Sequence, residues 1–214
     1  MSDNNLPNHV VYSQGVIDFV TVTAETCIFL ENAEQQDSKS FIDTAVKLLP
    51  LLYLKAALLK APEPVFDLEP ERFVTEDDYL YIKEIIEKLL GADDGYLEVF
   101  HPDMALSDTP IAAFVSEDIA DIYQEIKDFA ANYQSLDVDT MNDSLLHCLQ
   151  AFSEHWGQKL LNALRALHSL RHAEGFDSSD EEEDFDVIAG KSKLKKNAFL
   201  DFLSEDEDDF SKIL

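Results

Sequence analysis

Residues 154–172 read EHWGQKLLNALRALHSLRH and end the segment that decides the fold. Apolar residues recur here every three or four positions, and this spacing extends upstream to give a row of Leu145, Leu149, Phe152, Trp156, Leu160, Leu164 and Leu167. Such spacing is typical of one helix face packed against a core. We predict one helix over residues 139–172, about 50 Å long at about 1.5 Å per residue. A bend is expected near Gly157, which we interpret as a close helix contact, with a ligand pocket beside Trp156 as the alternative.

Three histidines in this stretch raise the question of a metal site. A rotation of about 100° per residue puts His155 nearly opposite the apolar row, His168 at its edge and His172 further toward water. A pair spaced four apart can chelate zinc. Here the H-E-x-x-H pattern is absent and the cationic Arg171 stands between His168 and His172. We therefore interpret the histidines as solvated or ion-paired side chains.

The upstream sequence predicts four more helices. They are expected over residues 13–34, from Asp37 or Ser38 as cap to about Lys60, over residues 75–91, and from Ser116 onward, with Pro50 kinking or breaking the second. Thr75 and Asp78 form a capping-box-like start for the third, and Ser116 is the expected cap of the fourth. Short connections favour antiparallel neighbours. Residues 1–173 are therefore predicted to form an all-α bundle of about five helices, with a short extended piece at GYLEVF (95–100).

The chain after His172 has a different composition. Residues 174–214 hold 14 acidic residues and 5 lysines, and the run DSSDEEEDFD (177–186) is too charged to form a core. We predict a mostly disordered acidic tail. Apolar side chains cluster near its end, namely Phe199, Phe202, Leu203 and Phe210. We interpret them as docking elements that become ordered on a partner. The alternative is that they have no role.

The net charge of −28 restricts the partners. Such a field repels nucleic acid and anionic lipid, so neither is an expected ligand. Cys27 and Cys148 lie in apolar helical patterns. This placement favours buried free thiols in a reducing compartment over a disulfide. The sequence shows no secretory leader and no run of about 18 apolar residues. A soluble cytoplasmic protein without a cofactor is expected, and its oligomeric state is left open.

A stripe of carboxylates follows the predicted helix SEDIADIYQEIKDF (116–129) and comprises Asp118, Asp121, Glu125 and Asp128. Carboxylates in this arrangement are suited to Mg²⁺ with substrate phosphates. A solvated helix face is the simpler interpretation. A third interpretation pairs the stripe with the last helix in an interhelical polar cluster of Asp118, Glu125, His168 and Arg171.

An enzyme hypothesis comes from two short motifs. Glu84-x-x-Glu87 and Glu125-x-x-Asp128 are similar to the paired motifs of the all-α nucleotide pyrophosphohydrolases, which are metal-dependent (Mg²⁺ or Mn²⁺) phosphohydrolases. The gap between the motifs is longer than in that family. Glu84 and Glu87 also lie opposite the apolar row of their own helix and should face water. We keep this activity as the alternative hypothesis.

The helix SEDIADIYQEIKDF, the later HWGQKLLNALRALHSL and the opening VIDFVTVTAETCIFLE together resemble an uncharacterised bacterial family of about 200-residue helical proteins. This domain of unknown function is common among Bacteroides-like bacteria. The similarity covers residues 10 to 172. It implies a bacterial, cytoplasmic, mainly helical protein, and it implies no activity and no catalytic residues.

The charge, the absent catalytic motifs and the tail aromatics lead to one functional prediction. The chain is expected to be a non-enzymatic adaptor or regulatory protein that binds a basic or hydrophobic surface of an unknown protein partner.

Overall fold

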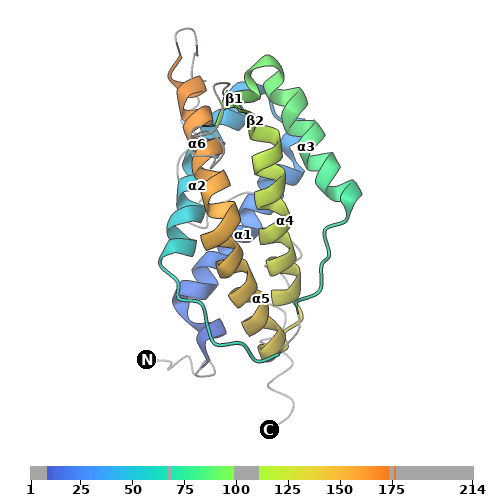
Figure 1. Cartoon of the computed structure of the whole chain (residues 1–214), viewed down its shortest axis with the longest axis vertical. Helices are drawn as coiled ribbons and strands as arrows, with labels where there is room; N and C mark the ends of the chain where they lie inside the picture. The colour runs from blue at the N-terminus through green and yellow to red at the C-terminus, as the bar shows by residue number, and fades with distance from the viewer. Residues whose placement is uncertain (1–8, 67–68, 99–110, 174–175, 177–214) are drawn as a thin grey trace, which may run out of the picture. The chain divides into compact units, whose positions relative to one another are not determined.

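The computed structural model describes residues 9–66, 69–98, 111–173 and 176. The predicted all-α bundle is confirmed (Figure 1). The helices are α1 (Gln14–Glu31), α2 (Ser38–Ala57), α3 (Glu76–Leu90), α4 (Val115–Tyr133), α5 (Val138–Ala151) and α6 (Gly157–Arg171). Short 3₁₀ turns are η1 (Val10–Tyr12), η2 (Ala33–Gln35) and η3 (Gly91–Asp93). The predicted tail, with its proposed docking residues Phe199, Phe202, Leu203 and Phe210, lies outside the described residues apart from Phe176.

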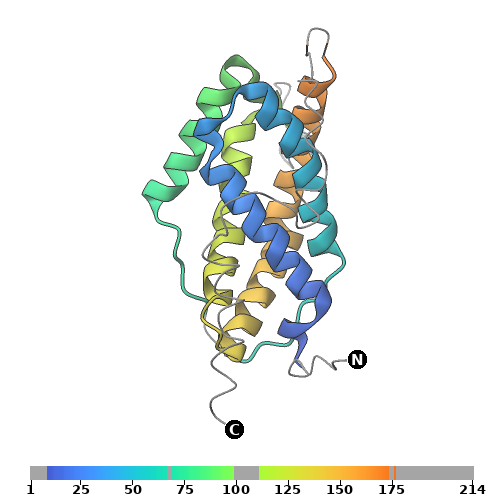
Figure 2. The same cartoon turned by 180° about the vertical axis from the view of Figure 1, so that it is seen from behind.

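Helix α4 packs against more helices than any other described helix. It contacts α1, α3, α5 and α6, whereas α2 lies between α1 and α6 (Figures 1 and 2). Large side chains fill the interior completely, among them Phe19, Phe41, Ile86, Phe129 and Trp156. Each such burial stabilises the fold by about 1.5–3 kcal/mol. Apolar burial between the helices is therefore a large stabilising contribution.

The predicted helix starts are correct in two cases and wrong in one. Asp37 caps α2 by accepting hydrogen bonds from the N–H groups of Lys39 and Ser40. Thr75 caps α3 in the predicted capping box with Asp78. Helix α4 differs, because it begins at Val115 and Ser116 is not its cap.

The cap of α4 comes from 22 residues upstream. The buried carboxylate of Asp94 accepts hydrogen bonds from the backbone N–H and the hydroxyl of Ser116, at 2.8 and 2.7 Å. This negative charge lies at the positive end of the helix dipole, where it is stabilising. A two-stranded antiparallel sheet places Asp94 there: β1 (Gly95–Leu97) pairs with β2 (Ala112–Phe114) with Tyr96 opposite Ala113. The predicted extended piece is thus confirmed over residues 95–97.

Pro50 does not break α2. The helix runs without interruption from Ser38 to Ala57, so the predicted break is wrong. A proline inside a helix costs about 3 kcal/mol. Three neighbouring leucines, Leu48, Leu49 and Leu52, are buried and offset that cost.

The predicted helix over residues 139–172 exists as one rod with an irregular turn. Helices α5 and α6 are joined by the π-helical turn η5 (Phe152–Trp156). The N–H of Gly157 donates to the carbonyl of Phe152, five residues earlier, and the Trp156 indole Nε1 donates to the carbonyl of Cys148 at 3.0 Å. Trp156 is fully buried and its ring lies 4.7 Å from that of Phe152. The space beside Gly157 is taken up by the carbonyl oxygen and the ring of Phe152 in its own π turn. The glycine is therefore explained by this turn, and neither the predicted contact with a neighbouring helix nor a ligand pocket beside Trp156 accounts for it.

Replacement of Gly157 tests this turn. A Cβ at this position would lie 2.4 Å from the Phe152 carbonyl oxygen and 2.9 Å from its ring, closer than atoms pack. We expect Gly157→Ala to destabilise the fold by about 2 kcal/mol despite the better helix propensity of alanine. Urea denaturation measures the change. Gly15→Ala is the control, because its Cβ would meet only the flexible tip of Leu59 at 3.1 Å. Equal stability of the two variants would show that the turn tolerates a side chain.

Candidate functional site

A long connection crosses one end of the bundle between α2 and α3. We call residues 59–75 the strap, of which 59–66 and 69–75 are described. It passes by the end of the bundle where α4 ends and α5 begins (Figures 1 and 2). The described parts contain no helix or strand, so their backbone groups need partners from elsewhere.

Helix α5 holds the first half of the strap. The carboxylate of Asp143 accepts hydrogen bonds from the N–H groups of Val65 and Phe66, at 2.8 and 2.6 Å. The adjacent amide of Asn142 donates to the carbonyl of Glu63 at 2.8 Å. Both side chains are almost completely buried. Their hydrogen bonds therefore fix an extended backbone without requiring any particular strap side chain.

Helix α4 holds the second half in the same way. One oxygen of Asp128 accepts from the N–H groups of Phe73 and Val74, at 2.7 and 2.8 Å. The amide of Asn132 donates to the carbonyl of Glu71 at 2.7 Å. Six hydrogen bonds from four polar side chains thus anchor the two halves of the strap.

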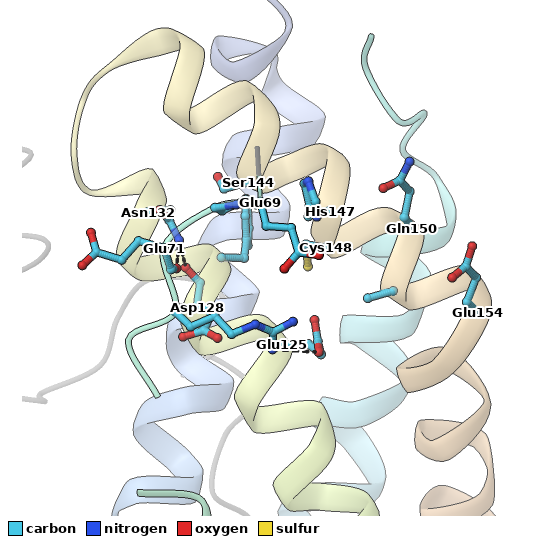
Figure 3. Close-up of a pocket in the computed structure, with 14 residues that line it drawn as sticks. Glu69, Glu71, Glu125, Asp128, Asn132, Ser144, His147, Cys148, Gln150 and Glu154 are labelled. Atoms are coloured by element: carbon cyan, nitrogen blue, oxygen red, sulfur yellow. Dashed lines mark hydrogen bonds and ion pairs between the residues drawn. The ribbon is translucent and has the colours of Figure 1, made fainter. Parts of the chain in front are cut away.

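A cavity of about 210 Å³ lies between the strap and the two helices (Figure 3). Strap residues 69–72 form one wall, and α4 and α5 form the others. The lining is strongly acidic, with carboxylates at Glu69, Glu71, Glu125, Asp128 and Glu154. The lining also includes the guanidinium of Arg72 and the imidazole of His147. We call this cavity the strap pocket.

Glu125 is the half-buried carboxylate of the strap pocket. Burial raises its pKa, an effect opposed by the positive charge of Arg72. The Arg72 Nη1 lies 3.9 Å from a Glu125 oxygen, which is an ion pair without a hydrogen bond. Among the described residues no donor hydrogen-bonds to Glu125, so its carboxylate is only weakly compensated.

The predicted interhelical cluster is wrong in its pairings. The guanidinium of Arg171 binds Asp43 of α2, while Asp118 accepts hydrogen bonds from the Tyr96 hydroxyl and Lys159. Glu125 faces Arg72 instead. His168 is exposed and its ring lies 4.5 Å from that of His172. The reason is the packing order: the end of α6 that carries Arg171 lies against α2.

The carboxylate stripe does lie along one helix, but its members have separate partners. Asp118 and Asp121 share Lys159, Glu125 pairs with Arg72, and Asp128 holds the strap. No three His, Cys, Asp or Glu side chains in the described part of the chain are grouped to bind a metal ion. Glu84 and Glu87 of the enzyme hypothesis are exposed on α3. The geometry therefore gives the phosphohydrolase alternative no support.

Asp118 is nevertheless the most buried carboxylate of that stripe. Burial raises its pKa, and the Tyr96 hydroxyl and the Lys159 ammonium oppose this shift. Lys159 bonds to both Asp118 and Asp121 and so ties α6 to α4. We interpret this cluster as a structural tie between helices.

The sequence did contain a signal for the strap anchors. Asn142, Asp143 and Ser144 stand together inside a helix at positions that are buried. Buried polar groups need hydrogen-bond partners. Ser144 finds one in the Met141 carbonyl of its own helix, whereas Asn142 and Asp143 bind the strap. Helical periodicity alone did not assign that segment.

Comparison with known proteins agrees with this architecture. The fold is an all-α bundle with a polar-anchored strap, and its family model is the domain of unknown function DUF5063, which matches residues 10–173. The chain belongs to this family. A crystal structure of protein BF1032 from Bacteroides fragilis is similar, with 44% sequence identity and a TM-score of 0.70. The match covers 77% of this chain and 97% of that one. No curated protein matches.

The anchors can be tested by hydrogen exchange of the strap. Asp143→Asn replaces an acceptor oxygen with a donor, leaving one strap N–H facing another donor, at a cost of about 1–3 kcal/mol. We expect faster amide exchange at residues 65 and 66. Asp139→Asn, an exposed first-turn residue of α5, is the matched control.

The same bond should depend on pH. Burial opposes ionisation of Asp143, but the N–H groups of Val65 and Phe66 and the amide of Asn142 hold its pKa below the ordinary value. The stabilisation is therefore complete above the unfolded pKa of about 3.9 and is lost as pH falls through the lower folded pKa. Strap protection that is unchanged by Asp143→Asn, or that does not fall in acid, would contradict this assignment.

Proposed function

We propose that the chain is a non-enzymatic binding protein, of adaptor or regulatory type, whose acidic body engages a basic surface on a protein partner. One observation carries the proposal: the way in which the body uses its basic residues. Residues 1–173 hold 30 acidic and 11 basic side chains. At least seven of the eleven basic side chains already form ion pairs within the described residues, namely Lys47, Lys55, Arg72, Lys83, Lys127, Lys159 and Arg171.

Most of these pairs join two helices. Lys55 binds Asp18 across α2 and α1, Lys83 binds Glu117 across α3 and α4, and Lys127 binds Glu31 across α4 and α1. The positive charges are thus held at helix contacts. Other carboxylates, such as Glu84 and Glu87 of α3, are exposed. Because acidic side chains outnumber basic ones in the body, this surface attracts a basic partner and raises its rate of association.

Two further findings support the kind of protein proposed. No described helix has both the length and the apolar character needed to cross a lipid bilayer. Cys27 and Cys148 are free and buried, and burial raises the pKa of the Cys27 thiol to about 12. Unpaired thiols of this kind support the cytoplasm as the compartment of our proposal.

Binding to a basic peptide tests the proposal. We expect the full chain to bind an octapeptide of alternating glycine and arginine in calorimetry at low salt, with affinity that falls as sodium chloride is added. An octapeptide of alternating glycine and glutamate should not bind. A chain that binds neither peptide would refute the proposed function.

The tail enters the same experiment as a separate arm. If Phe199, Phe202, Leu203 and Phe210 act as docking elements, their joint replacement by alanine weakens binding to a protein partner but leaves the octapeptide affinity unchanged. Pull-downs with the unaltered chain and with the alanine variant measure this difference. If both recover the same partners equally well, the tail has no docking role.

A further inference from the structure

We propose that the strap pocket is the receptor for an arginine side chain of the basic partner, with Glu125 as its carboxylate ligand. This inference rests on the proposed function and deepens it, because it names one position on the acidic body and one chemical group.

The pocket offers unpaired hydrogen-bond acceptors. Asn132 is 4% exposed and its amide nitrogen donates to Glu71 and Asp128, yet its Oδ1 atom accepts no hydrogen bond within the described residues. The second oxygen of Asp128 is likewise unpaired there, because both strap N–H groups bind Oδ1. Glu125 adds two more acceptor oxygens. These oxygens are open to solvent within the pocket, because Thr23 Oγ1 is the only buried side-chain polar atom without a hydrogen-bond partner among the described residues. A lining of accessible acceptors favours a ligand that only donates.

The size of the cavity selects a small group. Its volume of about 210 Å³ is below the roughly 300–1,000 Å³ of pockets that enclose drug-sized ligands. A guanidinium head group carries five N–H donors, no acceptor and a permanent positive charge. It therefore matches both the acceptors and the charge of the lining, and it is more weakly hydrated than an ammonium group.

The protein's own Arg72 marks the position. Its guanidinium lies 3.9 Å from Glu125, too far for a hydrogen bond, and 58% of its side chain is exposed. An exposed pair of this kind contributes little to stability. Arg72 is thus a cation of the protein itself that is only weakly bound to Glu125, and an arginine of the partner displaces it.

The strap makes this a built cavity. Glu71 and Arg72 belong to a backbone segment that Asp128 and Asn132 fix through three hydrogen bonds. The pocket wall is therefore already in place before a ligand arrives, which lowers the entropic cost of binding.

The glycine–arginine octapeptide, titrated by calorimetry against full-length variants, tests the proposal. We expect Glu125→Gln to weaken binding about tenfold or more, because a charge-assisted hydrogen bond is lost. Glu87→Gln removes the same charge from an exposed position on α3 and should leave the affinity within about twofold. Equal effects of the two variants would overturn the pocket while leaving the acidic-body function standing. No binding of the octapeptide to the unaltered chain would refute both.

Two further arms keep the test independent of folding. Arg72→Ala removes the internal competitor from an exposed position, so affinity should rise up to about fivefold. A misfolded protein would not show this gain, and a loss of affinity would overturn the displacement. An octapeptide with lysine in place of arginine should bind more weakly, and equal affinity would overturn the selection for guanidinium.

Discussion

The polar side chains of α4 connect this helix to four neighbours, namely α1, α3, α6 and the strap, and these contacts orient the bundle. Asp118 and Asp121 bind Lys159 of α6, Lys127 binds Glu31 of α1, and Glu117 binds Lys83 of α3. Further along, Asp128 and Asn132 hold the strap. Apolar burial brings these helices together without direction, whereas hydrogen-bonded charges select their rotation and register. In this very acidic chain, at least four of the few cations lie where two helices meet: Lys55, Lys83, Lys127 and Lys159.

This arrangement explains why the sequence predicted the elements better than their contacts. Five of the seven residues in the predicted apolar row of the last helix are buried, and the other two, Phe152 and Leu164, are partly exposed. The Thr75–Asp78 capping box is local, and it forms as predicted. Periodicity indicates which side of a helix is buried but not which helix covers it. Arg171 therefore received the wrong partner in the sequence-based prediction.

The strap shows a second limit of sequence reasoning. Asp143 lies 78 residues from Val65 and its partners are backbone N–H groups, which every residue except proline offers. No side-chain complementarity in the sequence identifies such a pair. For the same reason the strap pocket could not be predicted from the sequence. Glu125 was predicted as part of a carboxylate stripe, whereas its environment depends on the strap that packs over it. The buried Asp94 that caps α4 is a third example of a long-range polar contact.

The π turn at Phe152–Trp156 has a consequence for relatives of this chain. A turn closed by a bond spanning five residues holds one residue more than the α-helical turn that it replaces. Removal of one residue there would give a regular helix, but everything downstream would rotate by about 100°. Lys159 would turn away from Asp118, and Arg171 from Asp43. The extra residue thus behaves as an insertion that sets the phase of α6. Relatives that lack it need a different set of cations, or a compensating insertion before Lys159, to keep the same interhelical pairs.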